Sequence, residues 1–402
     1  MSELMPYLIF GLTAGSIYGL AAMGLVLTYK TSGVFNLAHG AVGAAGAYAF
    51  YSVRDQLGQP WPVAAAVAVL LVGGVSGLVL ERLAAALSEV STAYRIVATV
   101  GLLLAVRAVL LLLYGETARP FSAFLPQSTV ATVAGVRISV ESVVVLLLGT
   151  TSAVLLFLLF RRSRAGLAMR GVVDNADLLD MTGESPRAVR RNAWLIGSCF
   201  AAASGVLFAA NQQQLDATLL SLLVVQAFGA AALGAFTSLP LSFLGGLAVG
   251  IVQKIVSMLA ARHAELAGLD LNVPFLVLFA VLLLSPRRRL VEVGRQVKAR
   301  VTTAPVLDPR LRAGLLALGL AVALLLPFLV GSRLALWNAA LSQVLLFLSL
   351  GLLVRTSGQI SLGHIGFAAV GASAFAHSQS AGAPWVVAVL LAGLAAVPVG
   401  AL

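Results

Sequence analysis

Few residues of this 402-residue chain could carry out chemistry on their own. Only 10% of the residues are charged, and the sequence holds four histidines and one cysteine, Cys199. A single thiol cannot form an internal disulfide, and no cysteine or histidine spacing typical of a metal site occurs in the sequence. None of the three lysines follows a glycine, so the sequence lacks the phosphate-binding loop of ATP-hydrolysing proteins. We therefore expect no catalytic residues, no metal and no cofactor. The residues of interest are therefore those that could bind a partner protein or take part in a conformational change.

The first group of such residues lies in a polar segment, Arg161–Arg191. This segment predicts a short helix over 175–182 that ends at Gly183, since glycine easily adopts the left-handed conformation found after a helix. Ser185 and Pro186 then predict the start of another helix. The short helix would place apolar side chains between acidic ones, which favours docking into a groove of a partner protein. The alternative is a surface helix packed on its own protein or lying at the lipid headgroups. The candidate docking residues are Asp177, Leu178, Leu179, Met181 and Gly183.

The second group belongs to a motif that occurs twice, at an offset of 325 residues. Residues 30–39 read KTSGVFNLAH and residues 355–364 read RTSGQISLGH, and about half of the positions in 31–50 are identical to those in 356–375. In each copy the pattern predicts a glycine turn, then an Asn or Ser helix N-cap with histidine in the first helical turn. Such a segment could simply cap a helix at the membrane boundary, or it could act as a gate on a transport path. The candidate residues are Gly33, Asn36, His39, Gly358, Ser361 and His364.

The elements that position both groups are apolar helices. Apolar residues make up 60% of the chain, against roughly 45–50% in soluble domains. Polar residues divide the sequence into apolar runs, each of which is a candidate membrane crossing. We expect an all-α, polytopic integral membrane bundle of about 13 membrane helices. The runs cover 6–28, 37–53, 61–80, 95–114, 138–160, 192–211, 219–236, 240–261, 272–285, 313–331, 335–354, 361–377 and 384–402.

The charge distribution predicts how these helices are oriented. Of the 26 lysines and arginines, seven lie in Arg161–Arg191 and eight in Arg287–Arg312. Clusters of this kind mark the cytoplasmic loops of membrane proteins, so the net charge of +11 does not indicate nucleic-acid binding. With both clusters in the cytoplasm, the count of crossings places the N-terminus outside. We expect a multi-pass protein of the cytoplasmic cell membrane.

Several segments resemble a known family. Residues 15–24, 29–33 and 36–40 resemble the first permease subunit of branched-chain amino-acid ABC importers, and residues 233–240 resemble a later glycine-rich segment of that subunit. Residues 356–364 are similar to the start of the second permease subunit. The resemblance implies two permeases, two cytoplasmic ATP-binding subunits, an extracytoplasmic substrate-binding protein and an amino-acid substrate. It also implies that Asp177–Gly183 is the ATPase-coupling sequence, with Leu178 and Leu179 in place of the family's usual pair of small residues.

The motif and the resemblance together predict three parts. Residues 1–285 would form a first permease unit, 286–312 a basic cytoplasmic linker, and 313–402 the start of a second, parallel permease unit that is incomplete here. Two other classes of protein remain open. An ion-coupled secondary transporter or channel would need an acidic group near the membrane centre, and the expected spans hold none. A membrane-embedded enzyme would need clustered acid–base or nucleophilic residues.

Overall fold

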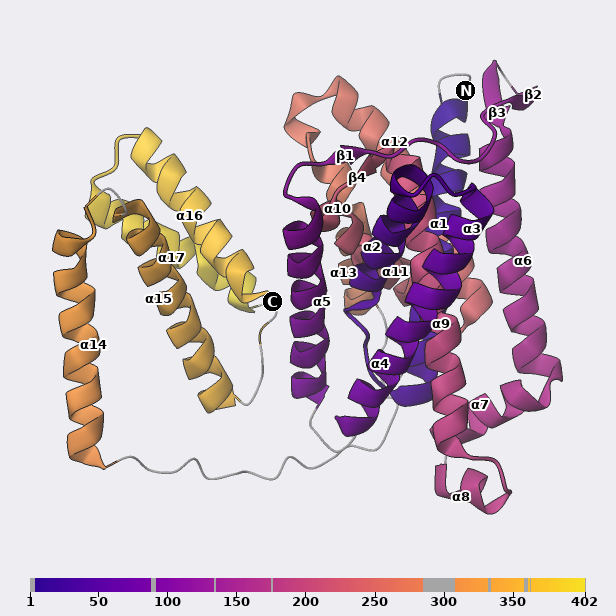
Figure 1. Ribbon diagram of the computed structural model, residues 1–402. Helices are drawn as coiled ribbons and strands as arrows, with labels where there is room; N and C mark the ends of the chain where they lie inside the picture. The colour runs from indigo at the N-terminus through magenta and orange to yellow at the C-terminus, as the bar shows by residue number, and fades with distance from the viewer. Residues whose placement is uncertain are drawn as a thin grey trace. The chain divides into compact units, whose positions relative to one another are not determined.

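The computed structural model describes residues 4–87, 92–133, 135–174, 176–284, 308–331, 334–357, 361 and 363–401. The chain divides into two compact units, Met1–Ala299 and Arg300–Leu402. The larger unit is a helical bundle with four short strands, shown in Figure 1. Its helices are α1 (Met5–Ser32), α2 (His39–Tyr51), η1 (Ser52–Gln56), α3 (Trp61–Ala66), η2 (Val67–Val72), α4 (Gly73–Ala86), α5 (Thr92–Tyr114), α6 (Val140–Arg162), α7 (Arg164–Asp174), α8 (Ala176–Met181), α9 (Pro186–Gln212), α10 (Ala217–Ser221), α11 (Leu223–Leu233), α12 (Leu239–Arg262), η3 (Ala264–Leu266) and α13 (Leu269–Leu284).

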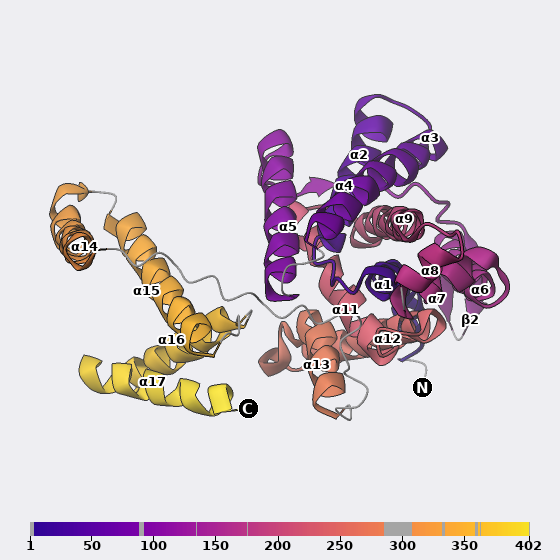
Figure 2. The same cartoon turned by 90° about the horizontal axis from the view of Figure 1, so that it is seen from below.

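Helix α1 forms the centre of the larger unit. Seen from below, it lies among α6, α9, α11 and α12, and it packs against all four (Figure 2). Glycines allow the closest of these approaches, because small residues let helix backbones meet in lipid. A Cβ atom built on Gly15 would come within 2.7 Å of the Gly246 carbonyl oxygen of α12. The core is therefore held by tight backbone packing as well as by large apolar side chains.

The outer helices expose apolar side chains. Helix α5 exposes Leu104, Leu112 and Leu113, and α6 exposes Leu147 and Leu155. Such faces suit lipid and would be unfavourable in water. Within the described residues, eight helical stretches are long and apolar enough to cross a membrane. They are Met5–Ser32, Trp61–Ala86, Tyr94–Tyr114, Val140–Arg162, Pro186–Gln212, Leu239–Arg262, Pro309–Leu329 and Trp337–Ser357.

The expected helices are largely found. Each of the thirteen apolar runs contains helix, but several of these helices are short, so a total of about 13 crossings stays a prediction. The run expected at 219–236 is divided into α10 and α11, and a further amphipathic helix, α7, lies in the polar segment. In α7 the buried residues Ala168, Met169 and Val172 recur at helical spacing. This spacing is visible in the sequence and is typical of an amphipathic helix.

The expected helical membrane bundle is confirmed, but it is not strictly all-α, because the described residues also form two small antiparallel sheets. Strand β1 (Arg119–Pro120) pairs with β4 (Gln214–Leu215), and β2 (Thr129–Val133) pairs with β3 (Val136–Ser139). The first pairing joins segments far apart in the chain, which local patterns cannot predict. The second is a hairpin rich in β-branched residues, with Gly135 at φ +82° in its turn. Both sheets lie at one end of the larger unit, and α7 and α8 lie at the other (Figure 1).

The described residues of the smaller unit form the helices α14 (Pro309–Leu329), α15 (Leu334–Ser357), α16 (His364–Ser380) and α17 (Trp385–Ala401). Helix α16 packs against α17 and contacts α15. The expected linker 286–312 lies mostly outside the described residues. Its last residues belong to α14 instead, because the Asp308 side chain accepts a hydrogen bond from the Arg310 backbone and caps a helix that begins at Pro309.

Candidate functional site

The polar segment forms a short helical excursion at one end of the larger unit. Helix α8 spans Ala176–Met181 and ends before Gly183, which has φ +86°. Ser185 then caps α9, its side chain accepting a hydrogen bond from the Ala188 backbone, and Pro186 occupies the first turn. The predicted helix, glycine stop and serine cap are confirmed. The expected helix covered 175–182; residue 175 lies outside the described residues, and at its other end α8 stops at Met181, one residue before the expected end.

The three large apolar side chains of α8, those of Leu178, Leu179 and Met181, have different surroundings. Leu178 is 60% exposed and Met181 is 84% exposed, whereas Leu179 is partly buried against the core. A Cβ atom on Gly171 of α7 would lie 3.4 Å from Leu179 Cδ1. Leu179 therefore anchors α8 on its own protein, and Leu178 and Met181 are directed outward.

The first copy of the repeated motif forms a buried turn between α1 and α2. Gly33 has φ +66°, and its backbone N–H donates to the Tyr29 carbonyl, which ends α1 as predicted. Phe35 stacks on Tyr29 with ring centroids 4.1 Å apart, and Thr99 of α5 donates a hydrogen bond to the Phe35 carbonyl. Val34 packs in a cluster that includes Trp194 of α9. The turn is thus enclosed by several helices.

The predicted caps were wrong in both copies. Helix α2 begins at His39 with Ala38 as its N-cap residue, and α16 begins at His364 with Gly363 in that place. Neither helix has a side-chain cap. In the first copy the Asn36 backbone carbonyl accepts from the His39 backbone N–H, so a turn of the main chain replaces the expected side-chain bond.

This arrangement leaves polar side chains buried without partners. Asn36 and His39 are fully buried, and neither the Asn36 amide nor either ring nitrogen of His39 has a hydrogen-bond partner. The His39 ring comes near the Ala21 backbone, although no hydrogen bond of acceptable geometry forms. A buried polar group of this kind costs about 1–3 kcal/mol. The sequence pattern placed these residues at a boundary, and only the packing reveals their burial.

The second copy differs in its hydrogen bonding. His364 Nε2 lies 2.6 Å from Ser349 Oγ of α15, within hydrogen-bond distance. Ser361 is partly buried and precedes the helix, and Gly358 lies outside the described residues. Within the larger unit, the first copy of the motif is a buried turn, whereas α8 exposes Leu178 and Met181 at one end of that unit (Figure 1).

Sequence reasoning missed one polar contact within the bundle. The Tyr18 hydroxyl of α1 donates a 2.8 Å hydrogen bond to Gln253 Oε1 of α12, and both side chains are buried. Tyr18 and Gln253 are 235 residues apart, so no local pattern indicates that they meet.

Comparisons with known proteins agree with this architecture. The family model "Branched-chain amino acid transport system / permease component" matches residues 7–285. The permease protein LivH of Escherichia coli K12 is 28% identical over 291 residues, which are 69% of this chain and 92% of that protein. LivH of Salmonella typhimurium is 27% identical with the same coverage. BraD of Pseudomonas aeruginosa is 26% identical over 267 residues, 63% of this chain and 87% of that protein. No solved structure matches the chain significantly.

Proposed function

Because the chain belongs to the family of branched-chain amino acid permease components, it is a transport protein of that kind rather than an enzyme, and we propose that α8 is its contact with separate ATP-binding subunits. The observation that carries this proposal is the different burial of the apolar side chains of α8. Leu179 fixes the helix to α7, while Leu178 and Met181 stay exposed at one end of the larger unit. A short helix with exposed apolar side chains suits the groove of a partner protein.

A series of helix–helix contacts connects α8 with the centre of the bundle. Helix α8 contacts α7, and α7 packs on α1, α6 and α9. Near the motif turn α9 and α1 approach closely, since a Cβ on Gly24 would come within 2.7 Å of the Gly197 carbonyl oxygen. Movement of α8 by the ATP-binding subunits would therefore shift α9 against α1 beside His39.

The buried turn would act as the gate that responds to this shift. Asn36 and His39 have polar atoms without partners, so an alternative packing that provides partners would be favoured over the present one by those hydrogen bonds. ATP-binding subunits that prefer the second packing would supply the bias toward it. The gate would then expose the transport path first to one side of the membrane and later to the other.

The proposed orientation places the α7–α8 end in the cytoplasm. The start of α1 and the two small sheets lie at the opposite end, where an extracytoplasmic binding protein would deliver a branched-chain or related amino acid (Figure 1). Support comes from Arg161, Arg162, Arg164 and Arg170, which cluster at the α8 end as cytoplasmic loops require. The chain would thus lie in the cytoplasmic membrane with its N-terminus outside.

We further propose that residues 313–402 correspond to the first helices of a second permease unit fused to the first. The helix boundaries support this, since α1 ends at Ser32 and α15 at Ser357, and α2 begins at His39 and α16 at His364. Both pairs differ by 325 residues, the offset of the sequence motif. Ser349, which meets His364, occupies the position equivalent to Gly24, which meets His39. The same contact is thus made in both units by different residue types.

Uptake by reconstituted vesicles tests the function. The full-length protein would be reconstituted with its ATP-binding subunits and supplied with binding protein and radiolabelled leucine. We expect uptake only when ATP reaches the ATP-binding subunits, and none when ATP is replaced by a non-hydrolysable analogue. Uptake driven by a proton or sodium gradient without those subunits would instead support the alternative, an ion-coupled transporter.

A further inference from the structure

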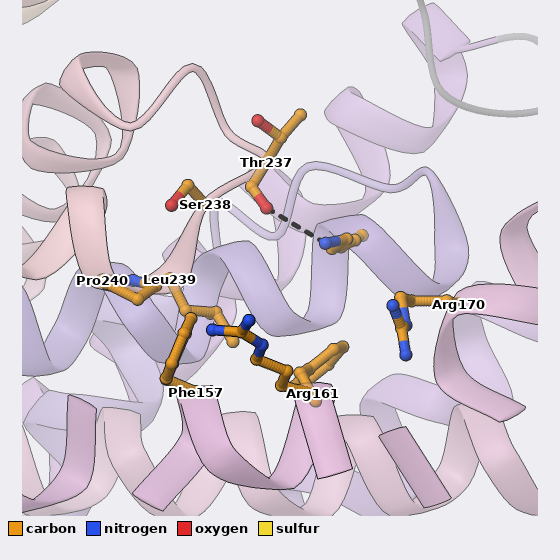
Figure 3. Close-up of a pocket in the computed structure, with 9 residues that line it drawn as sticks. Phe157, Arg161, Arg170, Thr237, Ser238, Leu239 and Pro240 are labelled. Carbon is orange, nitrogen blue, oxygen red and sulfur yellow. Dashed lines mark hydrogen bonds between the residues drawn. The ribbon is translucent and has the colours of Figure 1, made fainter. Parts of the chain in front are cut away.

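A cavity of about 290 Å³ lies between the end of α1, the end of α6, α7 and the start of α12 (Figure 3). Three cationic side chains reach it from three different helices. Lys30 comes from α1, Arg161 from α6 and Arg170 from α7. The remaining lining residues are Phe157, Phe160, Thr237, Ser238, Leu239 and Pro240.

The described residues that line the cavity carry charge of one sign. None of its nine described lining residues is acidic. Lys30 donates a 3.1 Å hydrogen bond to the Thr237 carbonyl oxygen, dashed in Figure 3, and its ammonium group lies 5.4 Å from the Phe160 ring centroid. The wall at Ser238 is the capped N-terminus of the 24-residue helix α12, which adds a partial positive charge. The cavity thus fits an anion that carries more than one acceptor oxygen.

The surroundings of the cavity are apolar and suit lipid. On α6, Leu155 and Leu158 are exposed within two turns of Arg161, and Phe157 both lines the cavity and is exposed. On α12, Leu241 and Leu244 are exposed directly after the lining residues. Both helices are long enough to span a membrane, and they contact each other. An anion bound here would therefore sit where headgroups meet the acyl region.

We propose that this cavity binds the phosphate of an anionic phospholipid headgroup, whose acyl chains lie along the exposed apolar side chains of α6 and α12. Basic pockets between membrane helices are suited to such headgroups, and arginine pairs with phosphate through two parallel hydrogen bonds. The cavity lies at the α7–α8 end, so the lipid comes from the cytoplasmic leaflet in the proposed orientation. The inference goes beyond the docking of ATP-binding subunits and does not depend on it.

Native mass spectrometry of the purified full-length protein tests this. The protein would be titrated with dioleoylphosphatidylglycerol, with dioleoylphosphatidylcholine and with inorganic phosphate. We expect the anionic lipid to bind in preference to the zwitterionic one, and phosphate alone to bind much more weakly. In the double variant Arg161→Gln/Arg170→Gln we expect about 30-fold weaker binding of phosphatidylglycerol, which corresponds to about 1 kcal/mol for each lost charge.

Two further variants distinguish binding in the cavity from a general effect of positive charge on lipid binding. Arg162→Gln removes a neighbouring exposed arginine that does not line the cavity, and it should bind phosphatidylglycerol like the parent protein. Arg161→Lys/Arg170→Lys keeps the charge and should retain most of the binding. Equal losses in Arg162→Gln and in the double variant would overturn the proposal. So would phosphate binding as tightly as the lipid.

Discussion

The ring of His39 lies against the backbone of Gly24, so that a Cβ atom on this glycine would come within 3.0 Å of His39 Cε1. The same hypothetical atom would lie 2.7 Å from the Gly197 carbonyl oxygen and 2.8 Å from Phe200 Cβ of α9. Gly24 is therefore the point at which the central helix, the buried turn and α9 meet.

This contact predicts that Gly24→Ala destabilises the protein. Backbone atoms of α9 would have to move, and overpacking of this kind costs about 1–3 kcal/mol. The melting temperature of the detergent-purified protein should fall. Gly74→Ala on α4 is the matched control, because no atom lies within 4 Å of the new Cβ, and its melting temperature should not fall. Equal stability of the two variants would contradict the packing described.

The gate hypothesis predicts opposite effects of His39→Leu on stability and on transport. Leucine removes two buried ring nitrogens that have no partners, so unfolding should become harder, by up to about 1–3 kcal/mol. Transport of the substrate leucine by this variant should nevertheless fall severely. The alternative packing of the buried turn would lose the hydrogen bonds that the His39 ring makes there. Ser198→Ala removes a different buried polar group without a partner, a hydroxyl, and should leave uptake unchanged. If His39→Leu also transported normally, the buried turn would be structural only.

The bond between Tyr18 and Gln253 predicts a measurable coupling between α1 and α12. Tyr18→Phe and Gln253→Leu each remove one partner, and each should lower stability because the other group is left buried. The double variant should lose less than the sum of the two. Interhelical hydrogen bonds in membranes give coupling energies averaging about 0.6 kcal/mol and reaching about 1.7. Additive effects in a double-mutant cycle would show that the bond contributes nothing.

Docking predicts different outcomes for neighbouring residues of α8. Leu178→Asp/Met181→Asp should abolish co-purification of the ATP-binding subunits while leaving the melting temperature unchanged, since both side chains are exposed. Leu179→Asp should lower stability, because Leu179 packs on α7. Leu167→Asp, at an exposed leucine of α7, is the control and should keep the partner bound. Normal co-purification by the double variant would argue against docking through α8.

The sequence predicted what depends on local chemistry. The apolar runs, Gly33 and Gly183 with positive φ, and the Ser185 cap all follow from residue types and their neighbours. The position of Asn36 and His39 could not be predicted in this way. Around the turn, Phe35 contacts Tyr29 of α1, Thr99 of α5 and Phe228 of α11, and Val34 packs in a cluster with Trp194 of α9. Asn36 was interpreted as a cap because local rules consider only the helix that follows. For the same reason Leu178 and Leu179 looked alike in sequence, although Leu178 is 60% exposed and Leu179 is partly buried against Gly171 of α7.

Cysteine labelling at α8 tests the central claim most directly. In a Cys199→Ala background, which removes the single native cysteine, Met181→Cys would be treated with a membrane-impermeant maleimide. We expect Met181→Cys to remain unlabelled in intact cells and to be labelled in inside-out vesicles. In those vesicles, bound ATP-binding subunits should protect Met181→Cys from labelling, while Leu167→Cys should stay reactive. Labelling of Met181→Cys from outside intact cells, or equal reactivity with and without those subunits, would contradict the claim.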